Sequence, residues 1–145
     1  MTPEPSELLA APVAARERAY APYSKFAVGA ALVAPDGRIF TGANAENASY
    51  GLSMCAERVA IYHALSEGVQ RFDAVAVAGP DDVRTMPCGA CRQVLSEFGA
   101  GMNVIFADSG RTRVVLLSSL LPDAFSGADL AAAHLGASLP RRDAR

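Results

Sequence analysis

Three cysteines in two well-separated segments constrain the fold of this chain more than any other feature. Cys55 stands alone, and Cys88 and Cys91 follow later as a Cys-x-x-Cys pair. Each segment precedes a stretch that we expect to be helical, which places thiols at helix N-termini. Free N–H groups and the helix dipole favour the thiolate there. If the two helix starts meet at one edge of a sheet, three thiolates come together.

The sequence around these segments predicts the element order β-β-α-β-α-β. Apolar residues over 26–34 and 38–41 flank the turn signal Pro35-Asp36-Gly37 and predict a β-hairpin. Ser53 is expected to cap a helix over about 54–65, which Gly68 closes. The remaining expected elements are a second helix and three strands, over 89–98, 74–78, 103–107 and 114–117. We therefore expect an α/β fold with helices packed on a mixed five-stranded sheet.

The length of 145 residues predicts a single domain over 1–145. Residues 6–20 are expected to form a helix with Pro12 as its weak point, and residues 126–145 a short helix followed by a loose tail. The N-terminus has no positively charged or apolar signal region, and the apolar runs are too short to cross a bilayer. We therefore expect a cytoplasmic protein that binds no membrane.

The charge balance argues against a nucleic-acid partner. Charged residues make up 19% of the chain, the net charge is −2, and no basic run is longer than Arg141-Arg142. A protein that grips nucleic acid by its phosphates usually has a basic face. A small or neutral substrate is favoured over a polymer.

The cysteines are expected to bind zinc, because cytoplasmic thiols stay reduced and three is an awkward number for disulfides. Three ligands leave one tetrahedral position open for water, which is typical of a catalytic zinc site. The two histidines, His63 and His134, have no useful spacing to a cysteine and are interpreted as surface or packing residues. The Cys-x-x-Cys pair taken alone could instead be a redox pair.

Glu57 is the candidate proton carrier, because it is the acid placed beside a ligand and a metal-activated water needs such a group. A glutamate favoured by the helix dipole is the structural alternative. Arg58 and Arg92 stand beside the ligand segments and could offset the negative charge of three thiolates by hydrogen bonds to sulfur. Either could be a plain surface arginine, and Arg58 is favoured for the charge-compensating role.

The motifs resemble those of the small, homotetrameric zinc-dependent cytidine deaminases over about residues 8–125. Cys55-Ala-Glu57 with Pro87-Cys-Gly-Ala-Cys91 fits the three-cysteine version of the zinc deaminase pattern. The further matching segments are Tyr20-Ala-Pro-Tyr-Ser24, Phe26-Ala-Val-Gly-Ala-Ala31, Gly42-Ala-Asn-Ala-Glu-Asn-Ala48, Cys88-Gly-Ala-Cys-Arg-Gln-Val94 and Leu120-Leu-Pro-Asp-Ala-Phe125. The resemblance implies a three-layer α/β/α sandwich that assembles as a homotetramer with active sites at the subunit interfaces.

The resemblance also implies roles for single residues. Cys55, Cys88 and Cys91 correspond to the ligands of one zinc per subunit, and Glu57 to the proton shuttle. The expected substrate-binding residues are Asn44 and Glu46 at the ribose, Phe26 at the pyrimidine ring, Ala56 and Cys88 through their backbone, and Phe125 in a neighbouring subunit's site. From spacing alone, a turn or strand-end polar cluster is the preferred interpretation of Asn44 and Glu46, and a core position is the preferred interpretation of Phe26.

The expected reaction is hydrolytic deamination of cytidine and deoxycytidine in pyrimidine salvage. Zinc-bound hydroxide attacks C4 while Glu57 moves protons to N3 and then to the amino group, and ammonia leaves. No organic cofactor is needed. The alternatives are a deaminase of the same superfamily with another substrate, a non-catalytic zinc protein and a thiol redox protein. Glu57 argues against the last two, because neither needs it.

Overall fold

The turn signal Pro35-Asp36-Gly37 forms the hairpin that the sequence predicts. In the computed structural model, which describes residues 4–81 and 83–135, β1 (Gly29–Val33) pairs antiparallel with β2 (Ile39–Ala43). Gly37 has a φ of 87°, a left-handed conformation that glycine adopts without steric cost, and its N–H donates to the Ala34 carbonyl at 2.9 Å. Residues 26–28 precede β1 as a loop rather than extending the strand.

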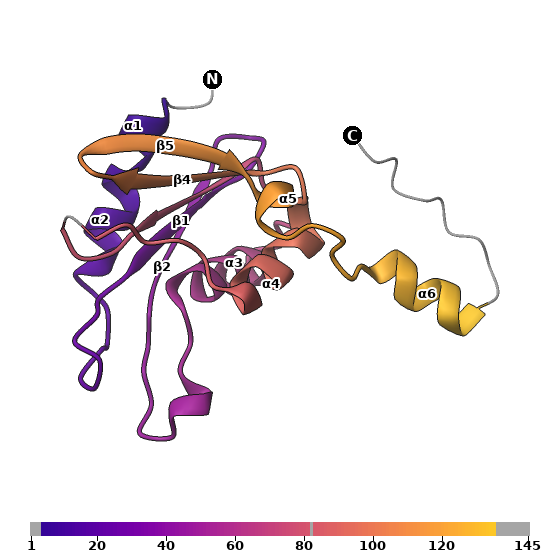
Figure 1. The fold of residues 1–145 in the computed structure, drawn as a ribbon, viewed down its shortest axis with the longest axis horizontal. Coiled ribbons are helices and arrows are strands. Elements are labelled where there is room, and N and C mark those ends of the chain that lie inside the picture. Colours follow the sequence, from indigo (N-terminus) through magenta and orange to yellow (C-terminus); the bar gives the residue numbers. More distant parts are fainter. Residues whose placement is uncertain (1–3, 82, 136–145) are drawn as a thin grey trace.

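Three further strands complete a mixed five-stranded sheet in the order β2-β1-β3-β4-β5 (Figure 1). They are β3 (Ala74–Ala78), β4 (Asn103–Asp108) and β5 (Arg111–Leu116). The β3–β4 pair is parallel and all other pairs are antiparallel. Parallel neighbours need a crossover connection, and helix α4 (Gly89–Gly99) supplies it. The predicted mixed sheet is confirmed.

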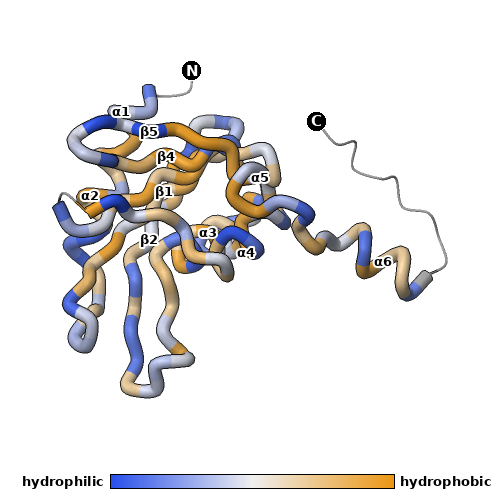
Figure 2. The backbone as a smooth tube through the Cα atoms, viewed as in Figure 1, coloured by the Kyte–Doolittle hydropathy of each residue, from blue (hydrophilic) through white to orange (hydrophobic). Residues whose placement is uncertain are grey.

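Alternate residues of the central strands β1, β3 and β4 face two separate helical layers, because successive side chains point to opposite faces of a sheet. On β1, Ala30 and Leu32 join the larger core cluster with helices α3 (Ala56–Ser66) and α4. Val33 faces the other way and packs with Leu8 of α1 (Pro5–Leu8), near α2 (Ala10–Arg16). Figure 2 shows these strands as the apolar centre of the molecule. The expected three-layer α/β/α sandwich is confirmed.

The helix expected over 6–20 is two shorter helices, α1 and α2, that break at Leu9 and end at Arg16. Pro12 explains the break, because it has no N–H to donate to Leu8 and its ring crowds that carbonyl. Helix α2 ends at Arg16 rather than at residue 20, because Tyr20 pairs with Ala45 in the extended segment that follows β2. The Tyr20 N–H donates to the Asn44 carbonyl at 2.9 Å.

The expected cap at Ser53 is wrong by two residues, and Cys55 is the N-cap of α3 instead. Met54 exchanges two backbone hydrogen bonds with Ala45, of 2.8 and 3.0 Å, which keeps it extended. The Ser53 hydroxyl accepts a hydrogen bond from the Asn47 N–H at 3.1 Å. Gly68, with a φ of 82°, closes the helix as expected.

The chain beyond the sheet continues through α5 (Leu117–Leu120) to α6 (Gly127–Leu135), which stands away from the body in Figure 1. The expected short helix after residue 126 is α6, and the expected loose tail lies outside the described residues. A short 3-10 turn, η1 (Tyr50–Leu52), lies in the long connection between β2 and α3. Within residues 4–81 and 83–135, no helix has the length and apolar character needed to cross a bilayer.

Candidate metal centre and active site

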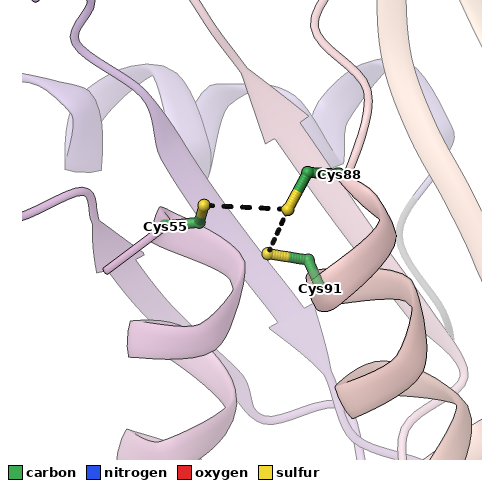
Figure 3. Close-up of side chains that lie close together, drawn as sticks. All are labelled: Cys55, Cys88 and Cys91. Atoms are coloured by element: carbon green, nitrogen blue, oxygen red, sulfur yellow. Dashed lines mark hydrogen bonds between the residues drawn. The ribbon is translucent and has the colours of Figure 1, made fainter. Parts of the chain in front are cut away.

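The starts of α3 and α4 lie side by side and bring the three cysteines together (Figure 3). Cys55 and Cys88 are the N-cap residues of these helices, both with extended backbone, and Cys91 lies in the first turn of α4. The Cys55 and Cys88 sulfurs are 3.9 Å apart, and those of Cys88 and Cys91 are 3.5 Å apart. The meeting of helix starts that the sequence predicts is therefore what the structure shows.

The spacing of the three sulfurs fits a tetrahedral zinc ion. All three lie within 4.8 Å of one another. A Zn–S bond of about 2.3 Å with tetrahedral angles requires sulfurs about 3.8 Å apart. Cys91 is buried, Cys55 is half-buried and Cys88 is exposed, so the cluster has one side open to solvent. In the described part of the chain, this is the one group of three or more metal-ligating side chains close enough to share an ion.

The three thiols favour thiolate formation at Cys55. The hydrogen bond that the Cys91 thiol offers to it, with help from Arg58 and Cys88, lowers the pKa of Cys55 to about 5. The same contact with Cys55, together with burial, raises the pKa of Cys91. A sulfur that ionises readily is a ready ligand, since metals bind thiolates rather than thiols.

Glu57 is the second residue of α3, after Ala56, and it is buried, with 4% of its surface exposed. Burial, with the negative charge of Cys55 adding to it, raises the pKa of Glu57 to about 7, against the opposing effects of its own N–H and of Arg58. A carboxyl group with a pKa near the working pH can both accept and return a proton. A buried acid beside a three-cysteine cluster that could hold a metal ion is the arrangement that proton-transfer chemistry needs.

Of the two arginines beside the ligand segments, Arg58 contacts sulfur. Its Nη2 donates to Cys55 Sγ at 3.5 Å, and its Nε is buried without a hydrogen-bond partner among the described residues. The contact with Cys55 raises the pKa of Arg58, which keeps it charged. Arg92 instead donates to two backbone carbonyls, of Pro87 at 2.8 Å and of Leu120 at 3.0 Å.

Asn44 and Glu46 follow β2 and hold the loop that carries Phe26. The Asn44 amide bridges two backbone groups, accepting from the Val28 N–H and donating to the Phe26 carbonyl, both at 2.8 Å. The Glu46 carboxylate accepts hydrogen bonds from the Tyr23 N–H at 2.9 Å and from Ser24. The hydroxyl of Ser24 and these N–H groups lower the pKa of Glu46.

This loop is joined to the cysteine cluster through the backbone. Ala45, which stands between Asn44 and Glu46, is hydrogen-bonded through its backbone to Met54. Because Met54 directly precedes Cys55, this contact holds Asn44 and Glu46 in a fixed relation to the start of α3. Phe26 is 37% exposed at the loop rather than buried in the core. Sequence reasoning missed the hydrogen bonds from Ser24 to Glu46, although Ser24 is the last residue of the matching segment Tyr20-Ala-Pro-Tyr-Ser24.

Phe125 lies between α5 and α6, and 60% of its surface is exposed. Gln93 Nε2 donates to its carbonyl at 2.9 Å, a contact that sequence reasoning did not predict. No hydrogen bond or ring contact found within residues 4–81 and 83–135 joins the Phe125 ring to the cysteine cluster. His63 contacts the Thr41 carbonyl at 3.2 Å and the Phe40 ring, and lies outside the cluster like the exposed His134.

Comparison with known proteins places this arrangement in a family. Residues 3–107 match the family model described as the cytidine and deoxycytidylate deaminase zinc-binding region. A cytidine deaminase of Sporosarcina psychrophila is 47% identical over 126 residues, which cover 86% of this chain and 93% of that protein. One of Mycobacterium tuberculosis is 48% identical over 112 residues, covering 77% of this chain and 82% of that protein.

Solved structures of cytidine deaminases share the fold. The crystal structure of the Burkholderia pseudomallei protein is 52% identical, with a TM-score of 0.78, and the match covers 83% of this chain and 98% of that one. For the Mycobacterium tuberculosis protein the identity is 44% and the TM-score 0.73, over 83% and 95% of the two chains. With a three-cysteine cluster that fits zinc, this chain belongs to the cytidine and deoxycytidylate deaminase family of zinc-dependent hydrolytic enzymes.

Proposed function

We propose that this chain hydrolyses cytidine and deoxycytidine to uridine and deoxyuridine with release of ammonia. The observation that carries the proposal is the buried Glu57, two residues from Cys55 in a three-cysteine cluster that fits zinc. The related proteins that cover most of the chain are cytidine deaminases. The net charge of −2 also suits a nucleoside better than a polymer of phosphates.

Cys55, Cys88 and Cys91 hold the zinc ion in this proposal. When bound, the metal supplies a water molecule acidified enough to act as a nucleophile near neutral pH. Arg58 offsets the negative charge of three thiolates through its contact with Cys55 Sγ. That compensation matters because excess negative charge weakens the metal's ability to acidify water.

Glu57 moves both protons of the attacking water. It accepts the first and delivers it to N3 of the pyrimidine, which makes C4 more electrophilic. The water oxygen bonds to C4, and Glu57 then carries the second proton to the 4-amino group. The C4–N bond breaks and ammonia leaves, so water and cytidine yield uridine and ammonia. Burial supports this role because it brings the Glu57 pKa to about 7.

The nucleoside is bound by Phe26 at the pyrimidine, by Asn44 and Glu46 at the ribose hydroxyls, and by the backbone at Ala56 and Cys88. Support comes from the loop geometry, since the Asn44 and Glu46 side chains both hold the segment that carries Phe26. An ionised carboxylate has about four acceptor sites, so Glu46 can bind this loop and a sugar hydroxyl together.

The assembly that fits this proposal is a homotetramer with shared active sites, built from a single domain over 1–145. Phe125 then reaches the site of a neighbouring subunit. Large exposed apolar side chains support an interface, because 60% of Phe125, 75% of Tyr50 and 70% of Leu52 are exposed in the single chain. A cytoplasmic role in pyrimidine salvage completes the proposal.

The direct test is to incubate purified protein with cytidine and follow the loss of its ultraviolet absorbance. The absorbance should fall, and one molecule of ammonia should be released for each molecule of cytidine consumed. Phe125→Ala should raise KM, since removing a ring from an interface pocket often costs about 2 kcal/mol or more. Absence of cytidine turnover by zinc-loaded protein would overturn the proposed substrate.

A further inference from the structure

Helix α4 contacts the chain's C-terminal segment through the two residues that follow its second cysteine. Arg92 Nη1 donates to the carbonyl of Leu120, the last residue of α5, at 3.0 Å. Gln93 Nε2 donates to the carbonyl of Phe125 at 2.9 Å. The two side chains therefore hold both ends of the turn over 121–125. Figure 1 shows this turn leading from α5, beside α4, out to α6.

The turn has fixed structure on either side of these two contacts. Leu117 of α5 is fully buried in the core. After Phe125, Ser126 directly precedes α6, and its N–H and hydroxyl both donate to one Asp129 carboxylate oxygen at 2.8 Å. Within the turn, Asp123 has a φ of 53°, an uncommon conformation for a residue with a side chain.

The Phe125 ring has little to orient it within its own chain. Its surface is 60% exposed, so packing against the same subunit contributes little to its position. A neutral hydrogen bond changes the population of a local conformation about fivefold. The bond from Gln93 to the Phe125 carbonyl therefore restrains the backbone from which the ring projects.

We propose that Gln93 is a positioning residue that sets Phe125 in a fixed relation to helix α4, which carries Cys88 at its N-cap and Cys91 in its first turn. Arg92 fixes the other end of the same turn. The helix that builds the metal site of one subunit thus also aims the aromatic side chain that the neighbouring subunit's site receives. This inference rests on the proposed role of Phe125 in nucleoside binding.

A double-mutant cycle on KM for cytidine tests this route of action. Gln93→Ala should raise KM about three- to tenfold, with kcat and zinc content unchanged. Gln93→Met keeps the length of the side chain but has no N–H, and should raise KM equally. Gln70→Ala removes an exposed glutamine that follows the C-terminal end of α3, the opposite end of the helix from Cys55, and serves as the control with unchanged kinetics.

The cycle distinguishes Gln93 from a residue with a general structural effect. Gln93 bonds the backbone of Phe125, and this carbonyl remains in Phe125→Ala. The Gln93→Ala change should then alter KM less than about twofold in the Phe125→Ala background, because the ring it positions is absent. Additive effects on KM, or a Gln93→Met variant with wild-type KM, would overturn the proposal.

Hydrogen exchange provides a readout that does not depend on the substrate. In Gln93→Ala, the amides over 121–126 should exchange faster, while those of β3 keep the wild-type rate. Unchanged exchange over 121–126 would refute the anchor whatever the protein deaminates. If Phe125→Ala keeps wild-type KM, this inference falls together with the role of Phe125, while cytidine turnover and zinc binding by the wild type still stand.

Discussion

Replacing Glu57 by glutamine isolates the proton-transfer role from zinc binding and folding. Glutamine is nearly the same size and fills the same buried volume, in which only 4% of Glu57 is exposed. It cannot accept a proton and return it. The sulfur cluster is untouched, so we expect one zinc per subunit and an unchanged unfolding temperature.

The expected loss follows from the burial of this site. Positioned proton transfer is worth about 10²–10⁴-fold, or about 2.7–5.4 kcal/mol of transition-state stabilisation. We expect the upper part of this range, because bulk water reaches a 4% exposed side chain poorly and cannot readily replace the lost carboxylate. Among the carboxylates of residues 4–81 and 83–135, Glu57 is the one that is buried.

The assay is steady-state deamination of cytidine, followed by absorbance, with zinc measured on the same preparations. The variant should lose turnover, with KM changed much less than kcat. A Glu57→Gln enzyme with full zinc and near-normal kcat would refute the shuttle and leave Glu57 as a residue favoured by the helix dipole.

Three further predictions concern charge, packing and pH. Arg58→Ala should release zinc more readily to a chelator than the wild type, because Cys55 loses its cationic neighbour at 3.5 Å; equal release rates would contradict the compensation. Gly42→Ala should lower the free energy of unfolding by about 2 kcal/mol or more, measured by urea titration, because its Cβ would lie 2.7 Å from the Ala56 carbonyl oxygen in α3. Glu46 has a pKa lowered below 4.5, chiefly by Ser24, so its stabilising effect is complete above pH 4.5 and is lost as pH falls through the lower folded-state pKa. Glu46→Gln should therefore weaken the fall in stability below about pH 4.5, and an unchanged pH dependence would argue against the Ser24 contact.

Much of the fold could be predicted because its signals are local. The turn Pro35-Asp36-Gly37 and the glycine at Gly68 mark ends that the structure confirms. The strand expected over 114–117 is longer, β5 over Arg111–Leu116, because an exposed edge strand with arginines has no continuous apolar run. The cap at Ser53 was predicted wrongly because the pairing of Met54 with Ala45 is a contact between distant segments.

In the site, too, the features with local sequence signals could be predicted, and the contacts between distant segments could not. The sequence predicts the meeting of Cys55 with Cys88 and Cys91, because each thiol stands at a helix start and a shared metal requires them to meet. The contact of Gln93 with Phe125 could not be predicted, since it depends on how α5 returns to α4 in space. The contacts of Glu46 with the loop before β1 likewise follow from the pairing of Tyr20 with the 44–46 segment.

The most direct test of the central claim is to measure zinc and cytidine turnover together during chelation and metal return. Removal of zinc from the three-cysteine cluster should abolish deamination, and activity should return in proportion to zinc up to one ion per subunit. Replacing Cys88 by alanine should prevent that return. A preparation without zinc that still deaminates cytidine at the full rate would contradict the account.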